Sequence, residues 1–423
     1  MRLPRPKRNN KKKRERIMLN ETYRAMLGHK SVIRETFMYG KQRAAEIGYE
    51  NVFDYSLGNP SVPCPDKFTK TMQTLLAEEE PVALHGYCPS QGDPGFRTAV
   101  AAHLAKTFGL PYEQKDIFPT TGAAGAIAHA IRAVTKPGDE VLTFAPYFPE
   151  YGPYVEGTGA VLKVVPPQAP AFQPNLDAFE AMLNENVTCV LINTPNNPTG
   201  VLYPKEILLE IIQVAREFGL LIFADEIYDR LVMDGKQHIS LASLTEDVPV
   251  ITLNGLSKSH CLCGYRCGWM VISGPRELTE DYRQGIIQLT SLRLCANTMA
   301  QIVIPAALDD METPASMVRP GGRIYEQREA TVRELEKIDG LSFVKNDAAF
   351  YVFPKLDVKK FNITNDKQFA HDLLDVTNIL LVPGSGFDWK DPDHFRIVML
   401  PQADILSDAI RRMGTFLDGY KQK

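Results

Sequence analysis

Between residues 115 and 275, short β-rich apolar runs alternate with amphipathic segments, and this alternation restricts the chain to few folds. The runs are VLTF (141–144), VLKVV (161–165), CVLIN (189–193), LLIFA (220–224) and VITL (250–253). Apolar strands that alternate with helices are typical of a mostly parallel sheet, because the connecting helices cover both of its faces. The pattern therefore predicts an α/β fold.

The sequence predicts one end of each of two helices. EILLEIIQVAREFG (206–219) is apolar at helical spacing and closes with Gly219, a residue that favours a helix C-terminus. The segment 94–108 follows Asp93, whose side chain suits an N-cap, and has Pro94 at its first helical position.

After about residue 320 the pattern changes to a polar helix (RIYEQREATVRELEKI), short strands and two further helices, which predicts a separate lobe. A helix near 20–48 is expected to pack with that lobe, since chains often return near their start. We expect a two-lobed protein with a cleft and four segments: a basic disordered arm (1–17), an N-terminal segment packing with the small domain (18–57), a large domain (58–320) and a small α+β domain (321–423).

The composition is ordinary for a soluble protein of 423 residues, with a net charge of −4 that gives no argument for a nucleic-acid or membrane partner. The longest apolar runs are too short to cross a bilayer. Seven scattered cysteines, an odd number, favour a reduced, cytoplasmic protein. The first sixteen residues hold nine Lys or Arg, and we favour a disordered tail, or a true start at Met18, over an arm that binds phosphate backbones.

Four of the five apolar runs lead into polar loops: APYFPEY, TPNNPTG, DEIYD and NGLSKS. In α/β sheets, ligands bind beyond the carboxyl ends of the strands. Four such loops at neighbouring strand ends predict one shared site.

Two further segments favour an anion at this site. TTGAAGAIAHAI (120–131) places small residues at a helix N-terminus, where backbone N–H groups can approach an anion, and it lacks the spacing of a dinucleotide site or a P-loop. In NGLSKSHCLCGYRCGW (254–269), Arg266 follows Lys258 by eight positions. A partly desolvated lysine near another cation has a lowered pKa and can act as a nucleophile or base.

The motifs NTPNNPTG, ADEIYD, LSKS followed by GYRCGW, and FRIVMLP occur in the order and spacing of one family. From about Tyr55 to its C-terminus the chain resembles the class I and II aminotransferases, enzymes of fold type I that use pyridoxal 5′-phosphate (PLP). The resemblance implies a large domain with a mostly parallel seven-stranded sheet covered by helices, and a smaller α+β domain. It also implies ping-pong transfer of an amino group between an amino acid and a 2-oxo acid.

The resemblance assigns the catalytic role to Lys258, which holds the cofactor as an aldimine and moves the proton between the substrate Cα and C4′ of the cofactor. Asp225 corresponds to the carboxylate that keeps the pyridine nitrogen protonated. Tyr228 and Asn197 correspond to the groups that bind the phenolic oxygen. Phe148 stands where the family stacks an aromatic ring on the pyridine, although plain core packing remains an alternative for it.

The resemblance also implies a phosphate site and a homodimer. The phosphate would be bound by Arg266, Ser257 and the backbone of Gly122, Ala123 and Ala124. Gly255 stands where relatives often have serine, so one phosphate contact is expected to be missing. Tyr87 resembles the tyrosine that reaches the phosphate of the neighbouring subunit, which implies shared active sites.

Three residues are expected to bind substrate. Arg396 corresponds to the arginine that clamps the α-carboxylate with both ends of its guanidinium fork. Gly58 lies on the loop that closes over that carboxylate in relatives. Arg293 lies close to the position of a second arginine that binds a distal carboxylate. No metal is expected, and Cys261, Cys263 and Cys267 are interpreted as small packing residues.

The stretches SLRLCANTMAQ and FRIVMLPQADIL are similar to those of alanine aminotransferases, so alanine and glutamate, with pyruvate and 2-oxoglutarate, are the expected substrates. An aspartate or broad-specificity aminotransferase is the first alternative. A PLP-dependent C–S lyase would keep the same lysine and aspartate. A PLP-sensing DNA-binding regulator is a non-enzyme alternative, but the basic arm of sixteen residues is too short for a DNA-binding domain.

Overall fold

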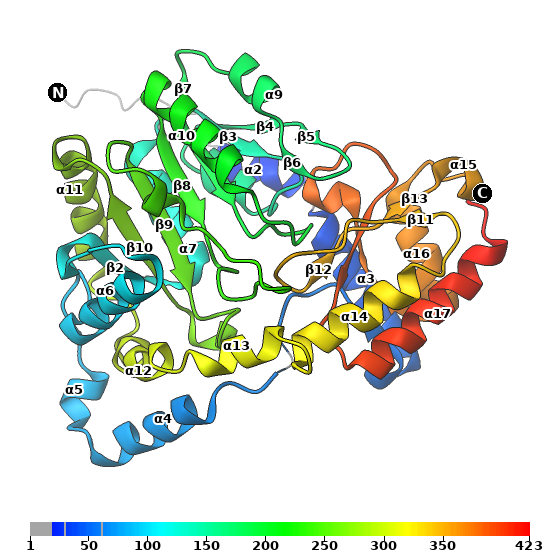
Figure 1. The fold of residues 1–423 in the computed structure, drawn as a ribbon, viewed down its shortest axis with the longest axis horizontal. Coiled ribbons are helices and arrows are strands. Elements are labelled where there is room, and N and C mark those ends of the chain that lie inside the picture. Colours follow the sequence, from blue (N-terminus) through cyan, green and yellow to red (C-terminus); the bar gives the residue numbers. More distant parts are fainter. Residues whose placement is uncertain (1–18, 29–30, 61) are drawn as a thin grey trace, which may run out of the picture.

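A central seven-stranded sheet organises the computed structural model, which describes residues 19–28, 31–60 and 62–423 (Figure 1). The strand order is β2 (Ile117–Thr121), β10 (Cys267–Ser273), β9 (Val250–Gly255), β8 (Leu221–Asp225), β7 (Val187–Asn193), β3 (Glu140–Phe144) and β4 (Val161–Val165). Only β10 runs antiparallel to its neighbours. The predicted α/β fold with a mostly parallel seven-stranded sheet is confirmed, and each of the five apolar runs lies in one of its strands.

Helices cover both faces of the sheet because successive strand residues point to opposite sides. Val190 and Ile192 pack in a core with α9 (Leu176–Ala181) and α10 (Lys205–Phe218). Cys189 and Leu191 pack in a second core with α7 (Gly122–Val134), α8 (Tyr151–Glu156) and α11 (Arg276–Arg293). A third core around Trp269 joins β2 and β10 to α4 (Asp66–Glu78), α6 (Pro94–Phe108) and α12 (Thr298–Leu308).

The two helix boundaries read from the sequence are confirmed. Asp93 caps α6, with its Oδ1 accepting a hydrogen bond from the backbone N–H of Phe96 at 2.8 Å. Gly219 ends α10 with a φ of 66°, in the left-handed region that a side chain disfavours.

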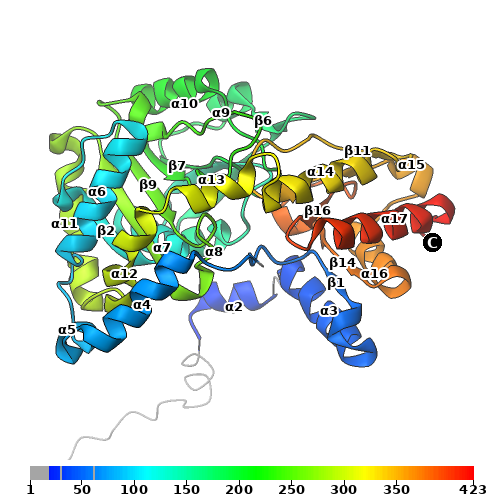
Figure 2. The ribbon, with the colours of Figure 1, turned by 60° about the horizontal axis from the view of Figure 1, so that its bottom comes forward.

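The C-terminal part of the chain has its own core. Its helices are α14 (Arg323–Leu335), α15 (Val358–Phe361), α16 (Asp366–Thr377) and α17 (Ala403–Gly419), with α14 and α17 side by side (Figures 1 and 2). Its strands are β11 (Leu341–Ser342) with β13 (Lys355–Leu356), and β12 (Tyr351–Val352), β16 (Phe395–Val398) and β15 (Val382–Pro383) in one small sheet. Short connecting elements elsewhere are α5 (Pro81–His85), α13 (Glu312–Val318), β5 (Pro167–Gln168) and β6 (Gln173–Pro174).

The N-terminal segment differs from the single helix expected near 20–48. It forms two helices, α2 (Glu21–Gly28) and α3 (Val32–Ile47), because the hydroxyl of Ser31 accepts from the N–H of Arg34 and starts a second helix. α3 packs against α16, and β1 (Phe53–Asp54) pairs with β14 (Ile379–Leu380), as Figure 2 shows. The basic arm, including Met18, lies outside the described residues.

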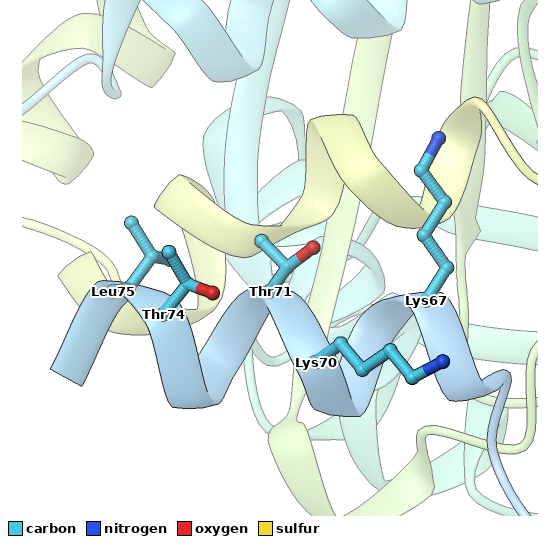
Figure 3. A pocket seen from close by; sticks show the side chains of 5 residues that line it. All are labelled: Lys67, Lys70, Thr71, Thr74 and Leu75. Carbon is cyan, nitrogen blue, oxygen red and sulfur yellow. The ribbon is translucent and has the colours of Figure 1, made fainter. Parts of the chain in front are cut away.

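Within the described ranges, no helix is long and apolar enough to cross a membrane. A hollow of about 450 Å³ lies on α4 and is lined by Lys67, Lys70, Thr71, Thr74 and Leu75 (Figure 3). All five residues come from one helix, and none of them was predicted to act in the site, which is expected at the strand ends.

Replacing Asp93 by Ala removes the side-chain acceptor at the start of α6 and should lower the free energy of unfolding by about 1 kcal/mol. Chemical denaturation followed by circular dichroism measures this change. Asp93→Asn keeps an acceptor oxygen and is the matched control. Equal destabilisation by both variants would contradict the capping role.

Candidate active site

The carboxyl ends of three central strands lie in register, as the polar loops predicted. Asn193 at the end of β7 pairs with Asp225 at the end of β8, which pairs with Leu253 of β9. The amide Nδ2 of Asn193 donates to the carbonyl oxygen of Asp225 at 3.0 Å, and its Oδ1 accepts from the N–H of Asn197 at 2.8 Å. These bonds fold the loop after β7 back over the end of β8.

Asp225 is a buried carboxylate with two donors. Its Oδ2 accepts from the hydroxyl of Tyr151 at 2.6 Å and its Oδ1 from the N–H of Ile227 at 3.3 Å. Burial raises the pKa of Asp225 to about 6, while the bond from Tyr151 acts in the opposite direction. Tyr151 was not predicted to act in the site, although it is the last residue of the loop APYFPEY. Its presence in that loop was the available indication, because a buried tyrosine hydroxyl usually has a hydrogen-bond partner.

Lys258 reaches into the same region. Its Nζ donates to the carbonyl oxygen of Gly58 at 2.6 Å, and its charge acts to lower the pKa of Asp225. The Sγ of Cys263 lies 4.0 Å from this Nζ and donates to the carbonyl oxygen of Ser257 at 3.0 Å. Cys263, interpreted from the sequence as a small packing residue, thus also lies beside the lysine amine. No metal-binding group of three or more His, Cys, Asp or Glu occurs in the part of the chain that the structure describes.

An anion site lies where β10 begins beside the N-terminus of α7. Arg266 is in the left-handed region, with a φ of 52°, and its guanidinium donates to the carbonyl oxygen of Cys263 at 2.8 Å. A Cβ on Gly122 would lie only 2.6 Å from its Nη2, so the guanidinium lies directly against the start of α7. Ser257 is buried, and Ala123 and Ala124 in the first turn of α7 are partly open. Cationic and N–H donors meet here as an anion requires.

Arg396 on β16 is a buried cation that joins distant parts of the chain. It donates to Oδ1 of Asn197 at 2.9 Å and to the carbonyl oxygen of Ser56 at 2.5 Å. The faces of Tyr351 and Phe387 lie 4.8 Å and 4.6 Å from its guanidinium carbon. Its buried Nε has no hydrogen-bond partner within the described residues. A buried guanidinium with a free donor is suited to bind a carboxylate.

Tyr228 is linked to Arg396 through Tyr351, a residue that was not predicted from the sequence. Its hydroxyl lies 2.8 Å from that of Tyr351, and burial raises the pKa of Tyr228. A Cβ on Gly58 would lie 2.3 Å from the Tyr351 hydroxyl, so a glycine lets the loop pass this ring. Tyr228, Asn197, Gly58 and Arg396 are thus brought together.

Three predicted site residues remain to be placed: Phe148, Tyr87 and Arg293. Phe148 meets Tyr151 edge to face at 5.6 Å, beside the ring that binds Asp225. Tyr87 is 82% exposed. The guanidinium of Arg293 donates to the carbonyl oxygen of Pro119 at 3.3 Å. Among the residues that the structure describes, neither Tyr87 nor Arg293 forms a hydrogen bond or ion pair with Lys258 or Asp225 of the same chain.

Comparison with known proteins agrees with this arrangement. Residues 50–410 match the family model for aminotransferases of class I and II. The chain is 37% identical to the glutamate–pyruvate aminotransferase AlaA of Escherichia coli K12, across 92% of this chain and 96% of the relative. It is 36% identical to the alanine aminotransferase of Mycobacterium tuberculosis H37Rv, across 90% and 89%. The alanine aminotransferase structure from Pyrococcus furiosus superimposes with a TM-score of 0.88 at 31% identity, across 95% of this chain and all (100%) of the other.

The buried aspartate at the end of β8, the lysine after β9 and the match across nearly the whole chain lead to one conclusion: the chain belongs to the class I and II aminotransferases and is a PLP-dependent transaminase of fold type I.

Proposed function

We propose that this enzyme moves an amino group between L-alanine and L-glutamate, with pyruvate and 2-oxoglutarate as the 2-oxo acids. The observation that carries the substrate class is Arg396, whose buried Nε has no hydrogen-bond partner among the described residues and offers a donor to an α-carboxylate. Relatives named glutamate–pyruvate and alanine aminotransferase, at 37% and 36% identity, support the choice of acids. Aspartate and a broad range of amino acids remain the alternative substrates.

The residues present fit the cofactor at each of its polar groups. Arg266 and the first turn of α7 suit a phosphate, and the buried carboxylate of Asp225 suits a protonated pyridine nitrogen. The hydroxyl of Tyr228 and the amide of Asn197 suit a phenolic oxygen. Lys258 supplies the amine, and the ring of Phe148 supplies a surface for stacking.

When bound, PLP supplies the sink for the electrons of the substrate Cα. In this proposal, Asp225 holds negative charge beside the ring nitrogen, and Tyr151 keeps that charge on the carboxylate. Lys258 takes the proton from the substrate Cα at its Nζ and delivers it during transfer. Arg396 fixes the α-carboxylate, which leaves only a few orientations for the Cα–H bond.

We further propose a cytoplasmic homodimer in which Tyr87 and Arg293 serve the neighbouring site. The 82% exposure of Tyr87 supports this, as does the presence of Leu292 and Leu294, exposed by 71% and 54%, on either side of Arg293. The separate C-terminal core supports a small domain from about residue 321, with segment 18–57 packed on it and a large domain over 58–320.

The central experiment is an absorbance spectrum of the purified protein before and after L-alanine. We expect a visible band of bound cofactor that is lost with L-alanine and restored by 2-oxoglutarate. Lys258→Ala should abolish this band and the turnover. Lys236→Ala is the control, since this exposed lysine pairs with Asp347 on the surface. Conversion by L-aspartate and not L-alanine would overturn the substrate, and release of a thiol, a 2-oxo acid and ammonia from cystathionine would favour a C–S lyase.

Tyr151→Phe removes one donor from Asp225 and should raise the pKa of that carboxyl further above its usual range. The acidic limb of the pH profile of kcat/KM should then move to higher pH by about one unit, since a hydrogen bond to a charged group contributes about 1.5–3 kcal/mol. Below this limb Asp225 is protonated and activity falls. Tyr147→Phe is the control, because Tyr147 stacks on Tyr151 without a bond to Asp225. An unshifted limb in Tyr151→Phe would refute the role of Tyr151.

Arg293→Ala should raise the KM for L-glutamate and 2-oxoglutarate by about tenfold or more, because a distal carboxylate would lose a charge-assisted partner. The KM for L-alanine and pyruvate should stay within about twofold, since neither has that carboxylate. Arg333→Ala, on an exposed helix face, is the control. Equal changes for both substrate pairs would assign Arg293 a structural role.

A further inference from the structure

The segment that carries Tyr87 lies against the segment that carries Arg293, and several bonds join them. The hydroxyl of Thr298 donates to the carbonyl oxygen of Gly86 at 3.0 Å, and the Oε1 of Gln301 accepts from the N–H of Asp93 at 2.8 Å. The hydroxyls of Ser90 and Ser291 lie 3.5 Å apart. The two segments are therefore docked in one register.

This docking brings together two cysteines, Cys88 and Cys295. The Sγ of Cys88 accepts from Nε2 of Gln301 at 3.2 Å, and the Sγ of Cys295 lies 3.9 Å from the hydroxyl of Thr298. The Sγ of Cys88 also donates to the carbonyl oxygen of Ala296, the residue after Cys295, at 3.9 Å. Both thiols therefore lie at the start of α12, and both residues are partly exposed.

We propose that Cys88 and Cys295 form a redox modification site, which an oxidant such as a peroxide closes into a disulfide within the chain. The Cys295 thiolate attacks hydrogen peroxide, becomes a sulfenic acid and releases hydroxide. The thiol of Cys88 then attacks that sulfur, the S–S bond forms, and water leaves with the sulfenic oxygen. In total, two thiols lose two electrons and two protons, and one peroxide is reduced to two waters.

The order of the two steps follows from the surroundings of each sulfur. Burial is the main cause that raises the pKa of the Cys88 thiol, which disfavours it as the thiolate that meets the oxidant. Cys88 therefore resolves the sulfenic acid formed at Cys295. A transient disulfide of this kind is compatible with a reduced compartment, where such bonds are usually regulatory.

The consequence for activity rests on the proposed function, in which Tyr87 and Arg293 complete the neighbouring site. Tyr87 precedes Cys88 directly, and Arg293 lies two residues before Cys295. A covalent bond replaces the Gln301 and Thr298 contacts of the thiols, so both backbone segments must adjust. A shift of about 1 Å in a positioning group can cost up to about a hundredfold in rate. Oxidation should therefore weaken cofactor retention and 2-oxoglutarate turnover together.

The test uses the PLP-loaded protein treated with hydrogen peroxide, alkylated, digested without reductant and analysed by mass spectrometry. We expect a peptide linked through Cys88 and Cys295, with kcat/KM for 2-oxoglutarate lower by about tenfold and restored by dithiothreitol. Cys88→Ser and Cys295→Ser should each abolish the linkage and the inhibition. Cys64→Ser, at another partly exposed cysteine, should retain both.

Absence of the linked peptide at peroxide doses that oxidise Cys64 would overturn the proposal. So would a linkage without loss of turnover, or a loss that persists in Cys88→Ser, which would indicate a different thiol such as Cys263. The untreated enzyme separates this result from the proposed function, because its cofactor band and alanine turnover do not depend on the disulfide.

Discussion

The buried carboxylate of Asp225 is the constraint on which the active site depends. A charge removed from water is costly unless neighbouring groups stabilise it. Here α8 brings the Tyr151 hydroxyl to 2.6 Å from the carboxylate and the N–H of Ile227 donates to its other oxygen, while the register of β7 and β8 lets Asn193 bind the backbone carbonyl of Asp225. The parallel sheet therefore supports the site as well as the core. Burial raises the pKa of the carboxyl to about 6 although the tyrosine and the backbone N–H act to lower it, so a positive charge beside Asp225 would further favour its ionised form.

Arg396 is a second buried charge that neighbouring groups stabilise, and it lies between the C-terminal core and the central sheet. Its β16 strand belongs to the C-terminal core, yet its guanidinium binds Asn197 beyond β7 and the backbone of Ser56. The C-terminal part is thus attached to the sheet through the residue proposed to bind substrate. Any movement of this part relative to the sheet would change the position of the carboxylate-binding group, so substrate binding and the packing of the two parts are coupled.

Local sequence patterns were sufficient to predict five strands and two helix ends. The five apolar runs identified strands, because burial on both faces leaves no polar alternation to obscure them, and Asp93 and Gly219 marked helix ends through local bonds. The partners of the site residues could not be predicted in this way. Tyr151 lies 74 positions from Asp225, Tyr351 lies 123 from Tyr228, and Ser56 lies 340 from Arg396. Tertiary packing alone brings these residues together, so no spacing in the sequence indicates them.

Close backbone packing leaves no room for a side chain at Gly255. Gly255 pairs directly with Gly268 across β9 and β10. A Cβ on Gly255 would lie 2.7 Å from the carbonyl oxygen of Cys267, and one on Gly268 would lie 2.6 Å from the backbone of Gly122. The two strands and the start of α7 are therefore pressed together without side chains between them. A side chain at residue 255 would require the strands to move apart, so the packing of β9 on β10 depends on both glycines.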